Sequence, residues 1–159
     1  MKKLFTWPIS LASISALLAC MGVAAFFLTT SSNGRDFLKP SDTTLVNTGR
    51  NVYEMACANC HGSKLQGQPN WRVRDARGYL PAPPHDPSGH TWHHPSKQLF
   101  NMVKFGLQHY AGPDYKTTMP KFERSLSDEQ IIAVLSFIKS TWPEEIRAKH
   151  NEIDMKAVD

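Results

Sequence analysis

The chain has 159 residues, of which 41% are hydrophobic and 20% are charged, and this composition excludes a disordered or collagen-like chain. Three cysteines are too few for a scaffold built on disulfides. The 18 Lys and Arg residues exceed the 14 Asp and Glu residues by four. No run of basic residues marks a surface for a phosphate backbone, so no nucleic acid is expected among the partners.

Residues 1–30 form the first predicted element, a transmembrane anchor or a signal segment. No charge follows Lys2 and Lys3 until Arg35, and residues 7–28 are apolar apart from scattered Ser and Thr. As a helix this stretch spans about 33 Å, against a hydrocarbon core of about 30 Å. The two lysines favour a cytoplasmic N-terminus, which places the rest of the chain on the outer side of the cytoplasmic membrane.

Three fates of this segment remain open. Its apolar stretch is longer than the core of about 7–15 residues in a signal peptide, which favours a retained anchor. The small residues 23–25 (Val-Ala-Ala) offer a cleavage site, and residues 17–20 (Leu-Leu-Ala-Cys) are similar to the sequence before a lipidated cysteine, here Cys20. All three interpretations predict export.

A polar tether is expected over residues 31–43, and the folded domain is expected over residues 44–142. The domain opens with a helix, because apolar residues recur at three-and-four spacing behind Thr43 or Thr44, either of which is a suitable N-cap. The apolar face of this helix consists of Leu45, Gly49, Val52, Tyr53 and Ala56.

The strongest motif, Cys57-Ala58-Asn59-Cys60-His61, follows that helix directly. Two thiols at this spacing before a histidine are the signature of c-type haem attachment, in which the thiols add to vinyl groups and His61 reaches the iron. A zinc half-site or a redox dithiol would use the same cysteines. Zinc requires further ligands and a dithiol does not require His61, so one covalent haem c is the favoured cofactor.

Residues 69–95 show little periodicity, and this stretch is longer than the roughly 12–15 residues at which a structureless loop becomes unusual. Trp71 and Arg72 lie nearest to the haem motif and are predicted to bind the cofactor, since two haem propionates need donors or cations. Arg74 and Arg77 are further candidates, and a solvated basic loop is the alternative.

Four of the seven histidines fall within ten residues of this stretch, at His85, His90, His93 and His94. Imidazole is a suitable ligand for copper or zinc, and His90, His93 and His94 would be the ligands of such a second metal ion. Structural hydrogen bonds or propionate contacts are the favoured interpretation of the cluster. A proton group linked to the redox centre, or a contact with a partner, is the third.

A second helix of the domain is predicted over residues 96–105. Its apolar residues have helical spacing, and Gly106 is a suitable stop. The residues expected to face inward are Leu99, Met102 and Val103.

A second axial ligand for the iron is expected in the stretch that contains Met119. Gly112, Pro113 and Pro120 exclude a continuous helix around this residue, so it is presented from a loop. Met119 is the favoured ligand, followed by His109 and then by Met102. Met55 and Met102 lie within helical patterns and are interpreted as core residues.

The last long helix begins with a capping box of Ser127 and Gln130 and is expected to end near Trp142. Residues 143–159 form a polar tail, in which Pro143 opens a short helix over residues 144–152. The tail is interpreted as a solvated cap, with a docking surface as the alternative. The apolar stripe of the long helix consists of Ile131, Val134, Leu135 and Ile138.

These motifs together resemble the single-haem class I cytochromes c of bacteria. The resemblance covers roughly residues 44–142, and its most specific part is residues 53–62 (YEMACANCHG). It also rests on residues 67–71 (GQPNW), on Met119-Pro120 followed by Phe122, and on the last amphipathic helix.

The resemblance implies an all-α fold of about four to five short helices around one covalently bound haem. It implies that His61 and Met119 bind the iron and that the carbonyl of Pro69 accepts the Nδ1 proton of His61. It also implies that the first and last helices cross where Gly49 faces Phe137.

Ligation by His and Met leaves no open position on the iron, and thioether ligation raises the reduction potential relative to two imidazoles. The sequence therefore predicts an electron carrier rather than an enzyme, tethered to the membrane and exchanging single electrons with a dehydrogenase and an oxidase or reductase complex. Two alternatives remain, a haem subunit of a redox enzyme and a copper- or metal-handling cytochrome that uses residues 85–94.

Overall fold

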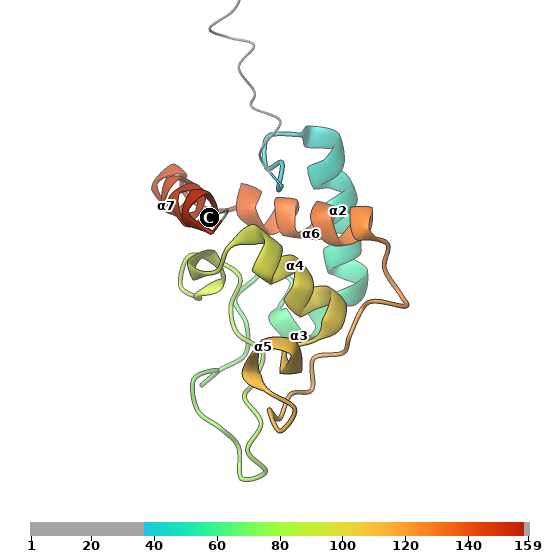
Figure 1. Ribbon diagram of the computed structural model, residues 1–159, viewed down its shortest axis with the longest axis vertical. Helices are drawn as coiled ribbons and strands as arrows, with labels where there is room; N and C mark the ends of the chain where they lie inside the picture. Colours follow the sequence, from blue (N-terminus) through green and yellow to red (C-terminus); the bar gives the residue numbers. More distant parts are fainter. Residues whose placement is uncertain (1–36, 158–159) are drawn as a thin grey trace, which may run out of the picture. The chain divides into compact units, whose positions relative to one another are not determined.

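The computed structural model describes residues 37–157, a set of short helices joined by long loops (Figure 1). These residues form six α-helices and one 3₁₀ helix and contain no strand, which confirms the predicted all-α class. The elements are α2 (Thr43–Ala56), α3 (Ala58–His61), η1 (Thr91–His93), α4 (Ser96–Phe105), α5 (Gln108–Ala111), α6 (Asp128–Ser140) and α7 (Glu144–Lys156).

The predicted anchor or signal segment lies outside the described residues. This holds for residues 1–30, for the alternatives at Cys20 and at residues 23–25, and for residues 31–36 of the predicted tether. Within residues 37–157, no helix combines the length and the apolar character needed to span a membrane.

Helices α2 and α6 cross at the centre of the domain (Figure 1). A Cβ atom on Gly49 would overlap the carbonyl of Ala133 and would lie 2.9 Å from Cβ of Phe137, so only glycine allows this close approach. The predicted crossing of Gly49 and Phe137 is therefore confirmed. The predicted stripe of α6 is buried here, with exposed fractions of 0% for Ile131, 2% for Val134, 4% for Leu135 and 4% for Ile138.

The folded domain begins before the predicted boundary at residue 43. Leu38 is 1% exposed and belongs to the hydrophobic core. Asp42, rather than either predicted threonine, is the N-cap of α2, and its carboxylate accepts a hydrogen bond from the Leu45 N–H over 3.0 Å. The predicted extent of the tether is wrong, because Leu38 packs in the core, Phe37 packs edge-on against Phe100 and the Lys39 N–H donates to Oγ of Ser136.

Helix α4 has the bounds that the sequence predicts and ends at Gly106, which has a φ of 91°. Of its three predicted inward residues, Leu99 is buried, whereas Met102 and Val103 are half-buried. The periodicity of the sequence does not predict α3 or α5, since four residues make only about one turn.

Helix α6 begins with the predicted capping box. Oγ of Ser127 accepts from the Gln130 N–H over 3.3 Å, and Oε1 of Gln130 accepts from the Ser127 N–H over 2.9 Å. The helix ends at Ser140 with Thr141 as its C-cap, close to the predicted end at Trp142.

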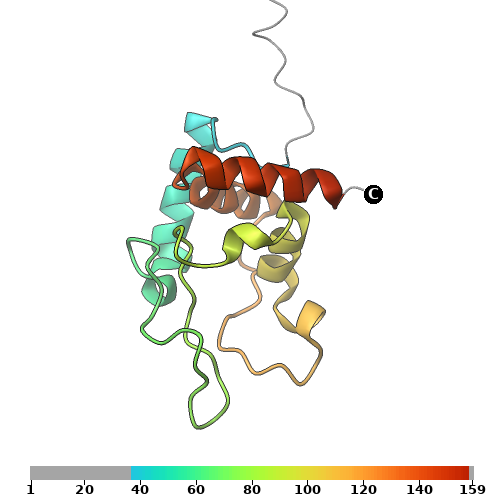
Figure 2. The same cartoon turned by 90° about the vertical axis from the view of Figure 1, so that its left-hand side faces the viewer.

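Helix α7 runs past the predicted end at residue 152 and lies beside α6 (Figure 2). His150 is fully buried, and its Nε2 donates to the carbonyl of His94 over 3.0 Å. The carboxylate of Asp154 accepts from the N–H (2.6 Å) and the hydroxyl (2.7 Å) of Ser96 and lies 3.5 Å from Nζ of Lys139. The polar tail is thus part of the folded domain and is attached to it by buried polar contacts.

Candidate functional site

The residues of the haem motif lie at the junction of α2 and α3. α2 ends at Ala56, Cys57 departs from helical geometry with a φ of −120°, and the single turn of α3 carries Cys60 and His61. Both cysteines are free thiols, Cys57 half-buried and Cys60 exposed. Burial, with a contribution from Cys60, raises the pKa of Cys57 to about 11, so its sulfur keeps a proton. Two thiols one helical turn apart are suited to addition across two vinyl groups.

The imidazole of His61 is held in one orientation. His61 is 7% exposed, and its Nδ1 lies 2.8 Å from the carbonyl oxygen of Pro83. Because a carbonyl only accepts, Nδ1 carries the proton and Nε2 keeps its lone pair. Nε2 has no hydrogen-bond partner in the part of the chain that the structure describes. Burial lowers the pKa of His61, which favours the neutral imidazole that binds metals.

The acceptor for His61 is Pro83 and not Pro69, so the predicted role of Pro69 is wrong. Pro69 is exposed. The chain reverses direction around it, with positive φ at Leu65 (63°) and Asn70 (55°), and a later proline thereby reaches the histidine. The prolines at positions 81, 83 and 84 could have been considered as acceptors from the sequence. The sequence does not predict the chain reversal that brings Pro83 to His61.

Residues 65–68 pair with residues 82–85 and hold Pro83 in place. A Cβ atom on Gly67 would overlap the backbone of Pro84, so the two segments approach as closely as a glycine allows. Their hydrogen bonds run from the Gln68 N–H to the Ala82 carbonyl (2.9 Å) and from the His85 N–H to the Leu65 carbonyl (2.8 Å).

Met119 is half-buried in residues 112–122, which lie opposite α3 in the lower part of the domain in Figure 2. Its backbone N–H donates to Oγ1 of Thr117 over 3.0 Å. Just beyond it, the Phe122 N–H donates to the carbonyl of Val103 in α4 over 3.1 Å, and Phe122 is 9% exposed. Met119 therefore lies on a loop that is fixed to α4 on its C-terminal side.

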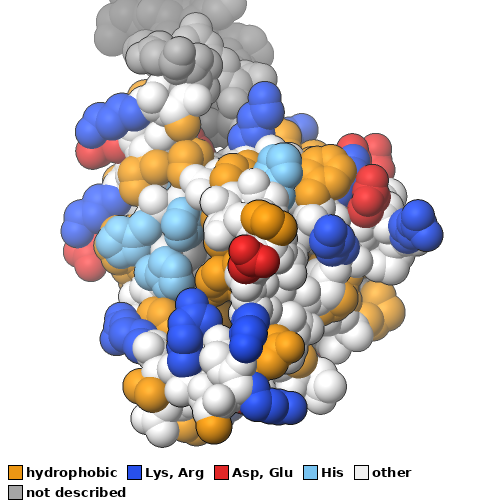
Figure 3. Space-filling model, turned by 60° about the horizontal axis from the view of Figure 1, so that its bottom comes forward, with side chains coloured by type: hydrophobic (Ala, Val, Ile, Leu, Met, Phe, Trp, Pro, Cys, Tyr) orange, Lys and Arg blue, Asp and Glu red, His pale blue; other side chains and the backbone are white. Residues whose placement is uncertain are grey.

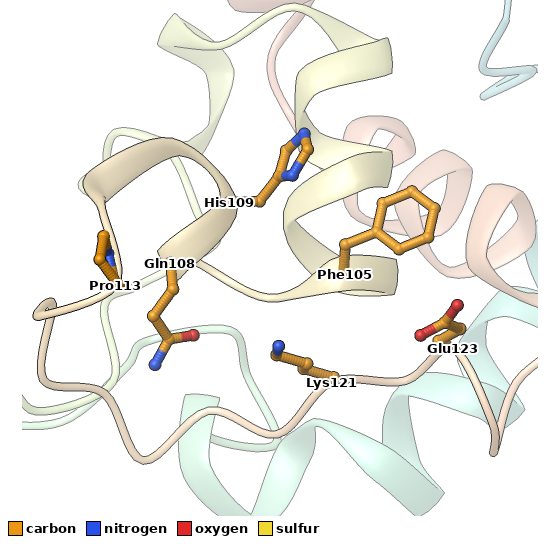
Figure 4. Close-up of a pocket in the computed structure, with 6 residues that line it drawn as sticks. All are labelled: Phe105, Gln108, His109, Pro113, Lys121 and Glu123. Carbon is orange, nitrogen blue, oxygen red and sulfur yellow. The ribbon is translucent and has the colours of Figure 1, made fainter.

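The other candidate ligands lie on α4 and α5. His109 is exposed on α5 and lines a hollow of about 480 Å³ together with Phe105 and Lys121 (Figure 4). Met102 is half-buried on α4. Met55 is 75% exposed on α2, so its interpretation as a core residue is wrong.

Trp92 presents a buried donor that lacks an acceptor. Its Nε1 is buried and has no hydrogen-bond partner among residues 37–157. A buried N–H without a partner costs about 1–3 kcal/mol, and a haem propionate is an anionic acceptor that would satisfy it. With the two thiols and the free Nε2 of His61, this indole shows that the residues present fit a covalently bound haem. From the sequence, Trp71 is the predicted cofactor-binding tryptophan, because it is nearer than Trp92 to the haem motif along the chain.

Trp71 and Arg72, the predicted cofactor-binding residues of the long loop, contact each other and His90. The guanidinium carbon of Arg72 lies 4.2 Å from the ring centroid of Trp71, and Trp71 stacks on His90 with ring centroids 5.4 Å apart. Arg74 and Arg77 bond within the loop as well, to the Gly78 carbonyl and the Asp75 carboxylate. These contacts stabilise the loop, and a role of Trp71 or Arg72 toward a propionate stays a prediction.

The clustered histidines do not converge on one point. His93 stacks on Trp92 with centroids 3.6 Å apart, and His94 packs edge-on against His90 at 5.4 Å. Within the described residues, no three His, Cys, Asp or Glu side chains are arranged to hold a metal ion. Histidines gather in one area of the surface in Figure 3, beside Lys and Arg side chains. The remaining member, His85, packs against His61.

An all-helical domain with two free thiols and an oriented histidine after its first helix has the architecture of a protein that binds haem covalently. The family model of cytochrome c matches residues 46–142. The chain belongs to the cytochrome c family, whose members carry covalently attached haem c, and Cys57 and Cys60 fit the attachment motif of such a haem. Comparisons with curated proteins and with solved structures find no match.

Proposed function

We propose that this cytochrome c transfers single electrons through a haem iron ligated by His61 and Met119. One observation carries the proposal: His61 donates Nδ1–H to Pro83 and keeps Nε2 free, one residue after the attachment thiols. The position of Met119 also supports the proposal, because this residue is half-buried and lies on a non-helical loop that hydrogen bonds hold in place.

When bound, the haem supplies the one-electron chemistry of its iron. The protein residues then have three tasks. Pro83 orients the imidazole of His61 and fixes its tautomer. The buried core side chains around α2 and α6 exclude water, which favours the less charged ferrous state. Ligands on both faces would leave no position for a substrate, so the domain would exchange electrons with its partners without binding or converting a small molecule.

Absorption spectra of the oxidised, haem-loaded protein test the ligand assignment. A methionine–iron bond gives a weak long-wavelength band, which we expect in the wild type and in Met102→Ala but not in Met119→Ala. His109→Gln is a second control and should also keep the band. Retention of the band in Met119→Ala would show that another residue binds the iron.

We further propose that the domain functions on the outer side of the cytoplasmic membrane, tethered by residues 1–30, with redox proteins of the same membrane as partners. The support is the sequence, in which Lys2 and Lys3 precede an apolar stretch long enough to cross a bilayer. Tethering would raise the effective concentration of the haem near a dehydrogenase and an oxidase or reductase complex. The intact mass of protein extracted from membranes tests this, since a mass that lacks residues 1–25 would contradict a retained anchor.

A further inference from the structure

The imidazole of His85 lies face to face with that of His61. The two ring centroids are 4.1 Å apart and the ring planes differ by 25°. The Pro83 carbonyl holds His61 through a single hydrogen bond at Nδ1, on one edge of the ring. A flat group packed on the face of the ring restricts tilting of the ring plane and also keeps water from that face.

Contacts from three parts of the fold hold His85 itself in place. Its Nδ1 shares a hydrogen bond of 2.8 Å with Oγ1 of Thr91, which is 8% exposed in η1. Its carbonyl accepts from Nε1 of Trp142, just after α6, over 2.8 Å. Its N–H donates to the Leu65 carbonyl over 2.8 Å. Both the backbone and the ring of His85 are therefore fixed, as a residue that positions another must be.

The backbone around His85 is equally constrained. A Cβ atom on Gly89 would overlap the carbonyl of Pro84, so residues 84–89 form a closely packed turn. Trp142 is 2% exposed, which means that the donor to the His85 carbonyl is itself locked in the core. The stacked pair thus rests on rigid surroundings on one face of the His61 ring.

We propose that His85 is a positioning residue for the axial ligand, acting through His61 on the orientation and hydration of the iron–imidazole bond. The inference rests on the proposed ligation by His61 and adds a second determinant beside Pro83. Shielding of the ligand from water disfavours the charged ferric state, so loss of the His85 ring should lower the reduction potential.

The test uses the haem-loaded full chain and two variants of this residue. In His85→Gln the flat ring is lost, and we expect the equilibrium constant for one-electron reduction to fall about tenfold, or about 59 mV. In His85→Phe a ring of similar shape remains, and we expect the equilibrium constant for one-electron reduction to lie within about twofold of the wild-type value. The control is His93→Gln, an exposed histidine that stacks on Trp92 and should leave the potential unchanged.

A second measurement separates positioning from general stability. The spread of the haem-methyl NMR shifts reports the orientation of the axial imidazole plane. This spread should differ from the wild-type value in His85→Gln and equal the wild-type value in His85→Phe. Thr91→Val keeps the stacked ring of His85 but removes the hydroxyl that bonds to it. We expect the reduction potential and the haem-methyl shifts to change in the same direction as in His85→Gln, but by less. This variant preserves the test if His85→Gln fails to load haem.

Three outcomes would overturn the inference, and they can be distinguished from one another. If the wild type shows the methionine–iron band while His85→Gln and Thr91→Val match it in potential and NMR shifts, the ligation proposal stands and the role of His85 is wrong. If the potential falls equally in His85→Gln and His85→Phe, the ring does not position His61. If His61→Gln leaves the potential and the NMR shifts of the loaded protein unchanged, both proposals are wrong.

Discussion

At the scale of single residues, the site depends on groups whose hydrogen-bonding capacity is left incomplete by the protein. Nε2 of His61 keeps its lone pair because Nδ1 carries the proton, and the Nε1–H of Trp92 has no acceptor among residues 37–157. Nε2 of His61 is thus available to bind a metal ion, and Nε1–H of Trp92 is available to donate to an anion. A haem carries both complements, its iron and its propionates.

The orphaned indole gives a prediction that depends on the cofactor. Trp92→Phe should lower the free energy of unfolding of the haem-loaded protein by about 1.5–3 kcal/mol, the range for a hydrogen bond to a charged group. In the haem-free form obtained with Cys57→Ala and Cys60→Ala, the same change should be neutral or stabilising, because it removes an unsatisfied donor. Urea denaturation of both forms measures the difference, with Asn47→Ala on the exposed face of α2 as the control. Equal losses in the two forms would contradict a bond between Trp92 and the haem.

The spacing of residues 57–61 was sufficient to predict the attachment site, because covalent haem attachment requires that order of side chains within one turn. Pro83 and Trp92 were not predictable in the same way. Each owes its role to a loop reversal that depends on residues in left-handed conformation, one of them Leu65, a residue type that seldom adopts it. Choosing between two prolines or two tryptophans required the path of the backbone.

At the scale of elements, the crossing of α2 and α6 is the contact most sensitive to a small change. Gly49→Ala adds a Cβ atom that overlaps the Ala133 carbonyl, and separation of the helices would disturb the buried residues between them. We expect the free energy of unfolding to fall by about 3 kcal/mol, at the upper end of the usual cost of overpacking.

Asn47→Ala, on the exposed face of α2, is the matched control and should change stability by about 0.5 kcal/mol or less. Denaturant unfolding followed by helical circular dichroism measures both variants. A Gly49→Ala protein as stable as the control would mean that the crossing is not fixed at this glycine.

The attachment of α7 makes stability depend on pH through His150. Burial and the charge of Lys139 lower the pKa of this histidine, and the carboxylate of Asp154 is already engaged by the two donors of Ser96. The unfolded chain takes up a proton here near the ordinary pKa of 6.5, whereas the folded domain does so only at lower pH. Because the unfolded state then binds more protons, the free energy of unfolding should decrease as pH falls below about 6.5.

Urea denaturation at pH values of about 7.5 and about 5.5 measures this dependence. In His150→Gln the decrease should be smaller than in the wild type, since one histidine that must stay neutral has been removed. His109→Gln, exposed on α5, should behave like the wild type. An unchanged pH dependence in His150→Gln would argue against uptake of a proton at this residue during unfolding.

Helices with a periodic apolar face were predicted well, and the bounds of α4 and the cap of α6 follow from local rules that do not depend on tertiary contacts. The length of α7 does not follow from such rules, because its inward face carries polar residues such as His150 beside a buried apolar residue, Ile146. His150 and Asp154 look like surface residues in the sequence, and only their contacts with His94 and Ser96 reveal that they are buried or half-buried. The burial of Leu38 was not predictable for a different reason, because Phe37 and Leu38 are an isolated apolar pair that shows no helical or strand period.

At the scale of the described domain, regular structure and the haem site are unevenly distributed. Helices α2, α6 and α7 have continuous backbone hydrogen bonds, whereas residues 62–90 and 112–127 contain none of the helices (Figure 1). His61, Pro83 and Met119 all depend on these loops. A covalent haem bound between them would supply contacts that the loops cannot make among themselves.

Hydrogen exchange should therefore respond to haem removal in a regional pattern. Compared with the loaded protein, the form with Cys57→Ala and Cys60→Ala should exchange faster in residues 65–90 and 112–122. Residues of α2 and α6 should change least, because their crossing is made by the backbone and side chains of the two helices without the haem. Mass spectrometry of peptic fragments measures this, and a uniform increase across all fragments would contradict the division into a stable helix pair and haem-dependent loops.

The indole bond from Trp142 to His85 links the C-terminal part of the domain to the haem motif. The two residues are 57 positions apart, and His85 packs directly on His61. A truncation before Trp142 would therefore remove a bond that holds the backbone of His85, and with it one support of the His61 ring. Trp142, just after α6, thus contributes to a site whose cysteines lie near the start of the domain.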